Sequence, residues 1–134
     1  MGQGDIRELV EDAEVLVPVP LYWKRHVRRG YNQSEVIARA LGGKVVRPAR
    51  RVVDTPTQTG KKNAAERWEN VRGAFKLRRP GLIEGKRVVV VDDVMTTGAT
   101  LKALGMELMK GRPASLSAVV VAIADPRGRG FEAI

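Results

Sequence analysis

The stretch VVVVDDVMTTGAT, residues Val88–Thr100, decides the fold that we expect for this chain. Its four valines are typical of a strand buried on both faces of a parallel sheet, and we expect a strand over Lys86–Val91. The acid pair Asp92 and Asp93 follows, and an amphipathic helix is expected over Thr97–Lys110. The order of strand, acids, turn and helix predicts a ligand site at the carboxyl end of the strand.

The turn between the acids and the helix has the composition of a phosphate site. Backbone N–H groups at a helix N-terminus lack partners and lie at the positive end of the helix dipole, so they attract a phosphate. Small residues let the backbone approach the phosphate, and hydroxyl side chains donate hydrogen bonds to its oxygens. The residues expected to bind it are Thr96, Thr97, Gly98, Ala99 and Thr100.

The acid pair suits two kinds of ligand. Asp92 and Asp93 can accept hydrogen bonds from a vicinal diol such as that of ribose, and they can hold Mg²⁺ directly or through water. The alternative is that both acids cap the helix and that residues 96–100 form an ordinary turn. The complete order of the segment favours the ligand site. It is neither a P-loop, which needs a following Gly-Lys-Ser/Thr, nor a dinucleotide fingerprint, which needs three spaced glycines.

The composition narrows the class of protein. The 134 residues suffice for a single domain, 1–134, with 43% hydrophobic and 29% charged residues. The absence of cysteine excludes disulfides and thiolate zinc sites. No apolar run approaches the roughly 20 residues of a membrane-spanning helix, and the acidic start is unlike a signal peptide, so we expect a soluble cytoplasmic protein. The formal charge of +9 indicates either an anionic partner or a solvated basic surface.

Strands and helices alternate outward from the central segment. Asn32 or Ser34 is expected to cap a helix that ends at Gly42, and Asn63 a shorter one. This alternation predicts an α/β fold, a parallel sheet flanked by helices on both faces. The tail after Ala124 is expected to be a loose terminus. The other expected strands are Val15–Val19, Val45–Val53, Ala74–Leu77 and Leu116–Ala124.

The central segment resembles the signature of the type I phosphoribosyltransferases, whose core is a Rossmann-like parallel sheet. In that family the acid pair binds the ribose hydroxyls of 5-phosphoribosyl diphosphate, and the following loop binds its 5-phosphate. The resemblance therefore implies transfer of a phosphoribosyl group with Mg²⁺ as cofactor and pyrophosphate as leaving group. Such a reaction needs positioning and charge neutralisation above all.

Two further stretches resemble the ComF-type competence family, which is also described as amidophosphoribosyltransferase-like. They are VPVPLYWKRHVRRGYNQSEVIARALG (Val17–Gly42) and TPTQTGKKNAAERWENVRGAF (Thr55–Phe75). With the signature, the resemblance covers Val15–Ala124. Members of this family often begin with a cysteine-rich zinc-binding module, which we expect to be absent here or to belong to another chain.

The same resemblance implies roles for two loops. The segment Leu21–Gln33 corresponds to a loop that contacts pyrophosphate, and residues 55–72 correspond to a flexible loop that closes over the substrate and excludes water. For each cation in these loops the alternative is a solvated side chain. The candidates in the first loop are Lys24, Arg25, Arg28, Arg29 and Gly30. The candidates in the second are Gln58, Lys61, Lys62, Arg67 and Arg72.

One departure from related enzymes bears on the substrate. Thr96 stands where phosphoribosyltransferases for hypoxanthine and guanine carry a third acid, which argues against salvage of 6-oxopurines. A complete amidophosphoribosyltransferase also needs a glutaminase domain with a cysteine nucleophile, and the chain has no cysteine. Transfer to ammonia stays open, and the sequence does not identify the acceptor.

Three functions stay open at this point. The leading hypothesis is a Mg²⁺-dependent phosphoribosyltransferase. The second is a non-catalytic module that binds 5-phosphoribosyl diphosphate or a nucleotide and acts in DNA uptake through protein partners. The third is direct binding of nucleic acid by the basic surface, which would weaken steeply with salt. A homodimer is compatible with each of them.

Overall fold

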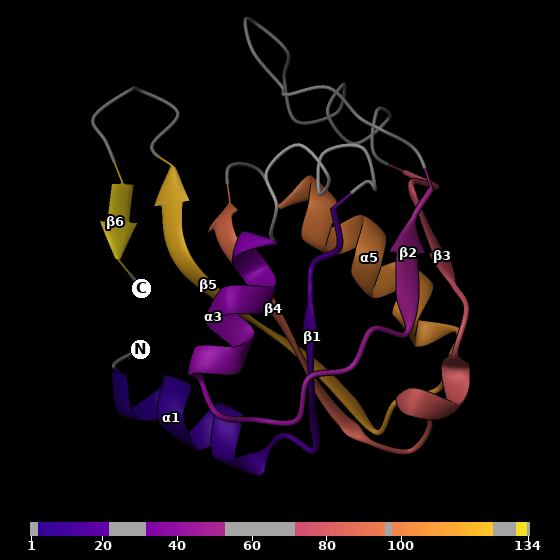
Figure 1. Ribbon diagram of the computed structural model, residues 1–134, viewed down its shortest axis with the longest axis horizontal. Coiled ribbons are helices and arrows are strands. Elements are labelled where there is room, and N and C mark those ends of the chain that lie inside the picture. The colour runs from indigo at the N-terminus through magenta and orange to yellow at the C-terminus, as the bar shows by residue number, and fades with distance from the viewer. Residues whose placement is uncertain (1–2, 22–31, 53–71, 96–97, 125–130, 134) are drawn as a thin grey trace, which may run out of the picture.

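The fold is a twisted sheet with helices on both faces and a small second sheet beside it (Figure 1). The computed structural model describes residues 3–21, 32–52, 72–95, 98–124 and 131–133. Along the chain the elements are α1 (Gln3–Asp12), β1 (Val15–Pro18), α3 (Gln33–Ala40), β2 (Ala49–Arg51), β3 (Phe75–Leu77), the 3-10 turn η1 (Pro80–Leu82), β4 (Arg87–Met95), α5 (Ala99–Met109), β5 (Ser115–Ala124) and β6 (Phe131–Ala133).

The larger sheet has the strand order β1-β4-β5-β6. Its first three strands are parallel, with Val15 opposite Val88 and Val90 opposite Ala118. This confirms the expected parallel sheet. The last strand, β6, pairs antiparallel with the final three residues of β5, so the expectation of a loose tail was wrong for residues 131–133. Backbone pairing with a strand edge holds this segment, and such pairing leaves no short-range pattern in the sequence.

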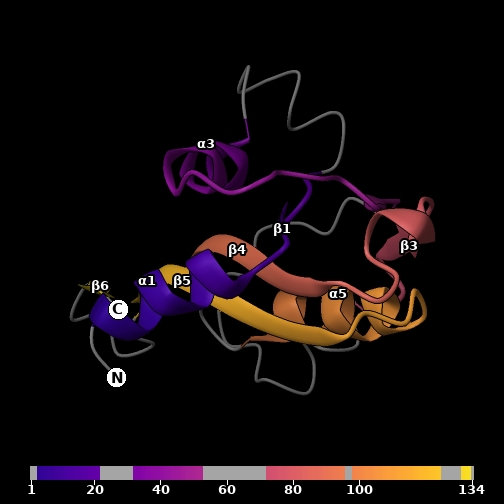
Figure 2. The ribbon, with the colours of Figure 1, turned by 90° about the horizontal axis from the view of Figure 1, so that it is seen from below.

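The valines of β4 pack into two separate cores because alternate residues of a strand point to opposite faces. Val88 and Val90 pack in the cluster that contains Leu104 and Leu108 of α5. The intervening valines pack with Leu16 and with residues of α1 and α3. Figure 2 shows α3 on one side of the sheet and α5 on the other. Each fully buried leucine or valine stabilises the fold by about 1.5–3 kcal/mol. Strand β4 contributes buried valines to both cores, so it makes a large contribution to the stability of the domain on each face of the sheet.

Asn32 caps α3 and ties its first turn to the sheet. Its backbone is extended (φ −103, ψ 117), and its Oδ1 accepts a hydrogen bond from the Ser34 backbone N–H at 2.9 Å. Its Nδ2 donates to the Val19 carbonyl at 3.0 Å, just past the end of β1. The expected cap is confirmed, and it places the N-terminus of α3 at the carboxyl end of β1.

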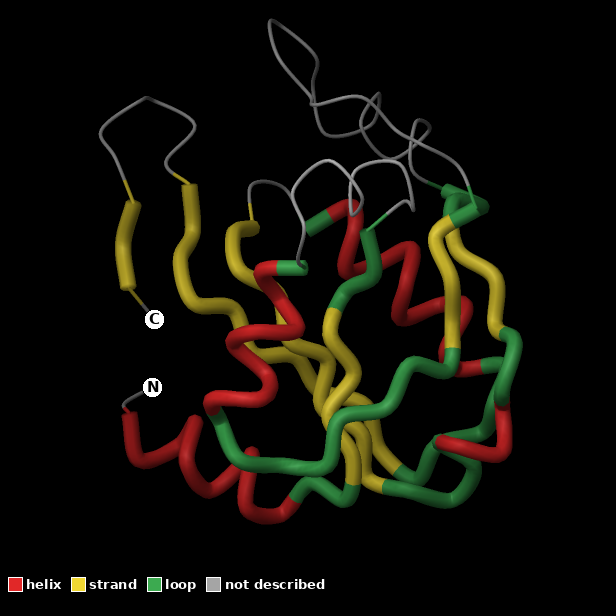
Figure 3. The backbone as a smooth tube through the Cα atoms, in the orientation of Figure 1, coloured by secondary structure: helices red, strands yellow, loops and turns green. Residues whose placement is uncertain are grey.

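The expected strand over Val45–Val53 was wrong in its extent. Val45 makes an isolated bridge with Leu16, and only Ala49–Arg51 form a strand, β2, which pairs antiparallel with β3. Pro48 lies between these two pieces and has no N–H to donate, so it interrupts the ladder. The tube in Figure 3 shows the resulting two-stranded sheet beside the larger one.

The central strand is longer than expected. β4 continues beyond Val91 through both acids to Met95, with Asp92 opposite Val120 and Met95 opposite Ile123. Aspartate disfavours strands, but the neighbouring β5 supplies backbone partners whatever the side chain is, and this tertiary pairing prevails over propensity. The acids therefore lie within the last half of the strand and not in the turn that follows it.

Candidate functional site

Asp92 is a buried carboxylate near the end of β4, with 7% of its surface exposed. Its Oδ1 accepts hydrogen bonds from the Ser34 hydroxyl at 3.3 Å and from the Asp93 backbone N–H at 2.9 Å. Ser34 is buried as well and lies in the first turn of α3. The start of a helix and the end of a strand thus hold one carboxylate in place.

The surroundings of Asp92 make its charge costly. The pKa of Asp92 is raised from the usual 3.8 to about 7, mainly by burial and further by the side chain of Asp93, through a hydrogen bond and its negative charge. The backbone N–H of Asp93 and the Ser34 hydroxyl act in the opposite direction. A buried acid beside a second acid favours a ligand that brings positive charge or donates hydrogen bonds.

A cavity of about 210 Å³ opens at this point of the structure. It lies where the ends of β1 and β4 meet the starts of α3 and α5, the usual place for ligands in parallel α/β sheets. Three of the residues expected to bind substrate line it together: Asp92, Asp93 and Thr100. Among the described residues the lining is Val19, Leu21, Asn32, Gln33, Ser34, Arg51, Asp92, Asp93 and Thr100.

Gly98 is the N-cap residue that precedes α5, and its backbone is left-handed (φ 80, ψ 2). Glycine adopts this conformation without strain, whereas other residues pay about 1–2 kcal/mol. The sequence suggested a glycine here so that a phosphate could approach the backbone, and the structure adds a conformational reason. Ala99 and Thr100 follow in the first turn of the helix and are half-buried.

The remaining residues expected in the site lie outside the described residues. They are Lys24, Arg25, Arg28, Arg29 and Gly30 of the first loop, Gln58, Lys61, Lys62 and Arg67 of the second, and Thr96 and Thr97 before α5. Their roles stay predictions. Arg72 is described and is exposed, and it does not line the cavity.

Sequence reasoning missed Ser34 as a partner of Asp92 and Arg51 as a lining residue. Ser34 was considered only as a helix cap, and Arg51 only as one of a run of basic residues. The Arg51 guanidinium lies over the Phe75 ring, 5.3 Å from its centroid, which holds β2 against β3 at the cavity wall. The basic run was a signal for Arg51, whereas nothing local could have indicated Ser34.

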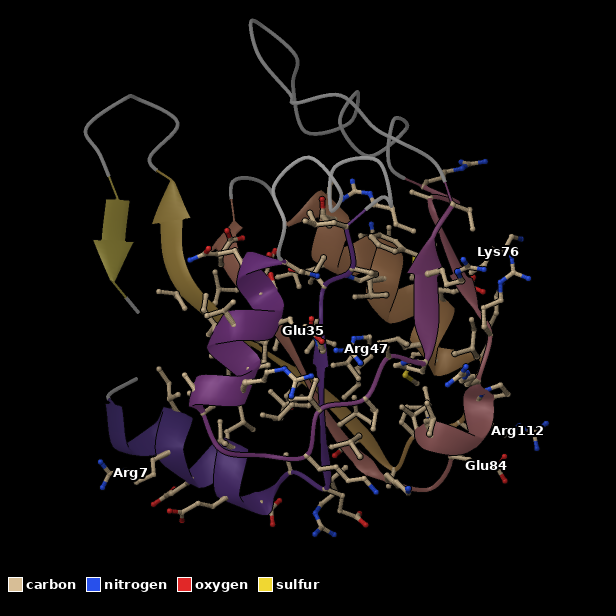
Figure 4. All side chains as sticks on the ribbon, in the orientation of Figure 1. Arg7, Glu35, Arg47, Lys76, Glu84 and Arg112 are labelled. Carbon is tan, nitrogen blue, oxygen red and sulfur yellow. The ribbon has the colours of Figure 1, made fainter. Side chains whose placement is uncertain are left out.

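A second cavity of about 370 Å³ adjoins the first and shares Leu21, Asn32 and Arg51 with it. Glu35 of α3 and Arg47 lie on its wall and form an ion pair, and Figure 4 shows their side chains side by side near the centre of the molecule. The two cavities give a ligand in the first one room to extend.

Two kinds of feature are absent from the described residues, a metal cluster and a membrane-spanning helix. Nowhere in this part of the chain do three or more His, Cys, Asp or Glu side chains gather as a metal cluster. A metal ion at the acid pair would therefore take ligands from a substrate or from water. No helix in the described ranges has the length and apolar character needed to cross a membrane.

The sequence was compared with models of protein families. The model described as "Phosphoribosyl transferase domain" matches residues 20–133, a range that includes all the described lining residues of the first cavity except Val19. The chain belongs to the phosphoribosyl transferase domain family. Within this family its relatives are of the ComF type, as the stretches Val17–Gly42 and Thr55–Phe75 suggested.

Three relatives illustrate this branch of the phosphoribosyl transferase family. Competence protein F of Haemophilus influenzae is 39% identical over 72% of this chain and 44% of its own length. The DNA utilization protein YhgH of Escherichia coli K12 is 34% identical over 75% of this chain and 45% of its own. Competence protein ComFC of Bacillus subtilis is 35% identical over 77% and 42%. The chain thus spans less than half the length of the curated relatives it matches.

Solved structures confirm the phosphoribosyltransferase fold. The allosteric regulatory enzyme of purine biosynthesis and the glutamine phosphoribosylpyrophosphate amidotransferase from B. subtilis, complexed with ADP and GMP, each superpose with a TM-score of 0.52. Both are 22% identical, and each match covers 85% of this chain and 24% of the other. The core described above is therefore that of a type I phosphoribosyltransferase.

Proposed function

We propose that the chain binds 5-phosphoribosyl diphosphate together with Mg²⁺ and transfers the phosphoribosyl group to a nitrogenous acceptor. The observation that carries this proposal is the meeting of Asp92, Asp93 and Thr100 in one cavity of about 210 Å³. Carboxylates suited to a diol and a helix N-terminus suited to a phosphate lie together there, as a ribose 5-phosphate requires. The reaction would take place in the cytoplasm, the location expected from the sequence.

The acid pair would bind the ribose hydroxyls. Asp92 already accepts hydrogen bonds from Ser34 and from the Asp93 backbone, so its carboxylate is oriented before the sugar arrives. Such preorganisation reduces the ordering cost of binding. The 5-phosphate would lie against the backbone N–H groups of Gly98, Ala99 and Thr100, with Thr96 and Thr97 as further hydroxyl donors.

The donor set fits Mg²⁺ that is held jointly by protein and substrate. Mg²⁺ commonly takes one or two carboxylates and completes its shell with water and substrate phosphates, and Asp92 and Asp93 offer two. Repulsion from Asp93 contributes to the raised pKa of Asp92, and a cation between them would relieve it. When bound, Mg²⁺ would neutralise negative charge on the diphosphate.

In the proposed reaction the bond from ribose C1 to the pyrophosphate oxygen breaks, and its electron pair leaves with pyrophosphate. The acceptor nitrogen forms the new bond to C1 and loses a proton where it arrives protonated. The sugar is cation-like in between, so the protein must neutralise the leaving group and exclude water. Arg51 supplies one positive charge at the cavity wall. The other proposed cations are Lys24, Arg25, Arg29, Lys61, Lys62 and Arg67, with Gly30 allowing close approach.

A second candidate is a non-catalytic module that binds 5-phosphoribosyl diphosphate or a nucleotide and acts in DNA uptake through protein partners. The names of the relatives, competence protein and DNA utilization protein, favour it. The same cavity would serve this function, and only turnover separates the two candidates.

The test is a calorimetric titration with 5-phosphoribosyl diphosphate and Mg²⁺, followed by an assay for pyrophosphate release with ammonia and a panel of bases. Asp92→Asn/Asp93→Asn removes both carboxylates and keeps their volume. Glu8→Gln/Glu11→Gln removes two exposed acids of α1 as the matched control. We expect the wild type and the control to bind and the site variant to lose at least tenfold in affinity.

The three outcomes decide between the candidates. Binding with pyrophosphate release supports the transferase. Binding without release from any acceptor supports the module. Equal affinities in the wild type and the site variant, or no affinity in the wild type, would overturn both, because each depends on the acid pair.

A further inference from the structure

Four arginines surround a hollow of about 720 Å³ on the side of the molecule that carries the small sheet. Arg47 and Arg50 come from the approach to β2 and from β2 itself, and Arg78 and Arg79 follow β3. All four are exposed, and the remaining lining is apolar: Val45, Val46 and Leu82. None of its described lining residues is an acid. We call the hollow the arginine groove and define it by the four arginines.

The backbone holds the two pairs of arginines against each other. The N–H groups of Arg78 and Arg79 donate to the Pro48 carbonyl at 2.8 and 2.9 Å, and Pro48 is fully buried. On the other side, Val46 N–H donates to the Leu16 carbonyl of β1 at 2.9 Å. The groove is therefore attached to the central sheet and built on fixed main chain, so that a partner would meet preformed charge.

This concentration of charge is only partly neutralised by the protein. Arg47 pairs with Glu35, which also lies 3.6 Å from Arg39. Among the described residues no ion pair involves Arg50, Arg78 or Arg79. The register of the small sheet places Arg50 directly opposite Lys76, and like charges at that spacing repel. Lys76 also acts on Glu107 of α5, so the repulsion is partly offset on that side.

The shape of the groove distinguishes a chain of phosphates from a single one. Arg47 and Arg50 also line the neighbouring cavity of about 370 Å³, so the positive surface continues from one hollow into the next. A single phosphate would occupy one pair of guanidinium groups, whereas an extended polyanion can use all four. Arginine donates in a planar fork that matches phosphate oxygens. The described lining contains no aromatic side chain for stacking bases.

We propose that the arginine groove binds the phosphodiester backbone of a nucleic-acid strand without reading its sequence. This inference is independent of the proposed catalytic site, because Arg78 and Arg79 do not line the cavity that contains Asp92. Contacts to phosphate alone carry no sequence information, so strands of different base composition should bind alike. The favourable free energy should come largely from counterion release.

The test is fluorescence anisotropy with a short labelled oligonucleotide, used as a single strand and as a duplex, over a series of salt concentrations. Arg78→Gln/Arg79→Gln removes two charges from the groove and leaves the backbone bonds to Pro48 intact. The matched control, Arg7→Gln/Lys86→Gln, removes two charges that do not line the groove, and both variants lower the formal charge from +9 by two. Figure 4 shows Arg7 on α1, well away from Arg47.

We expect the groove variant to lose at least tenfold in affinity at low salt, while the control stays within about threefold of the wild type. The slope of log affinity against log salt should fall by about 1.4 for the single strand, since each lost phosphate contact removes about 0.7. The duplex arm identifies which form of the backbone binds more tightly. Binding of 5-phosphoribosyl diphosphate should be unchanged in the groove variant, which keeps this test separate from that of the catalytic site.

Two results would overturn the proposal. Equal losses in the groove variant and the control would mean that the overall charge attracts the strand and that the groove has no special part. Absence of binding to either form of nucleic acid at low salt would mean that the groove does not bind a phosphodiester. Circular dichroism melting of both variants ensures that each is folded when it is compared.

Discussion

The hydroxyl of Ser34 donates a hydrogen bond to Oδ1 of Asp92 across 3.3 Å, joining residues that are 58 positions apart in the chain. Both side chains are buried, at 4% and 7% exposure. The contact lowers the pKa of Asp92 against the larger effect of burial. It also orients the carboxylate, so Ser34 is expected to influence ligand binding through Asp92.

Ser34→Ala should weaken binding of 5-phosphoribosyl diphosphate with Mg²⁺ by about three- to tenfold at pH 7, since a hydrogen bond to a charged group contributes about 1 kcal/mol or more. Without this donor the pKa of Asp92 rises, so the loss should shrink as the pH is raised to 8. Ser34→Thr keeps the hydroxyl and should bind nearly as the wild type. Calorimetry at pH 6, 7 and 8 checks this, and a loss that does not depend on pH would point to a purely structural role.

Asp92→Asn should stabilise the unliganded protein at pH 8. The pKa of Asp92 is about 7 in the folded chain and 3.8 in the unfolded one, so the folded state holds the proton more tightly. The stability that this proton provides is complete below pH 4 and is lost as the pH rises to about 7. Asparagine stays neutral throughout, so the variant keeps a stability on the order of a few kcal/mol that the wild type loses.

Thermal melting of both proteins between pH 4 and 8 measures this difference. The melting temperatures should nearly coincide at pH 4 and separate by several degrees at pH 7 and above. A constant difference across the range would show that burial does not raise the pKa of Asp92. Higher stability combined with lost binding would mark Asp92 as a residue kept for function at the expense of the fold.

Gly98→Ala should lower both stability and binding because position 98 has a left-handed backbone (φ 80) at the start of α5. Alanine pays about 1–2 kcal/mol there, whereas asparagine tolerates this conformation better. Gly98→Asn should therefore melt at a higher temperature than Gly98→Ala. If a phosphate approaches the backbone at this point, both variants should bind it more weakly, because each adds a Cβ atom. Recovery of full affinity with asparagine would mean that only the conformation matters.

Glu107→Ala should lower the free energy of unfolding by about 1–3 kcal/mol, because it leaves a backbone donor without its partner. The Leu77 N–H donates to Glu107 Oε2 at 3.0 Å and thereby ties β3 to α5. Glu107→Gln keeps an acceptor and should lose only the attraction of Lys76 and the exposed pair with Lys110, and an exposed pair contributes at most about 1 kcal/mol. Urea unfolding of the two variants checks this, and equal losses would show that the charge matters and the backbone bond does not.

The elements with strong local patterns were predictable. The four valines of β4 and the Asn32 cap of α3 follow from rules that act within a few residues. Predictions from local patterns failed where pairing with a distant strand determines the secondary structure. Strand β4 extends through Asp92 and Asp93 because β5 lies beside them, and the tail at Phe131 becomes a strand for a similar reason.

The sequence predicted the residues of the site that come from one segment, but not the lining residues that come from other segments. Asp92, Asp93 and Thr100 come from one continuous segment, so their closeness was implied by the sequence order alone. Ser34 and Arg51 reach the cavity from two other segments, through the helix α3 and the small sheet. Nothing in the pattern around either residue shows which segment it will meet, because that depends on how the chain crosses between strands.

The strand order described above has a consequence for how this chain is made. Strand β1 pairs in register with β4, with Val15 opposite Val88. Before β4 is synthesised, α3 can pack against β1, but the described residues offer it no strand partner apart from the bridge from Leu16 to Val45. During synthesis the N-terminal half therefore leaves the ribosome without its sheet. Such distant pairing slows folding. We expect cooperative folding only once α5 and β5 have emerged. Before that point the nascent chain should be most prone to aggregation.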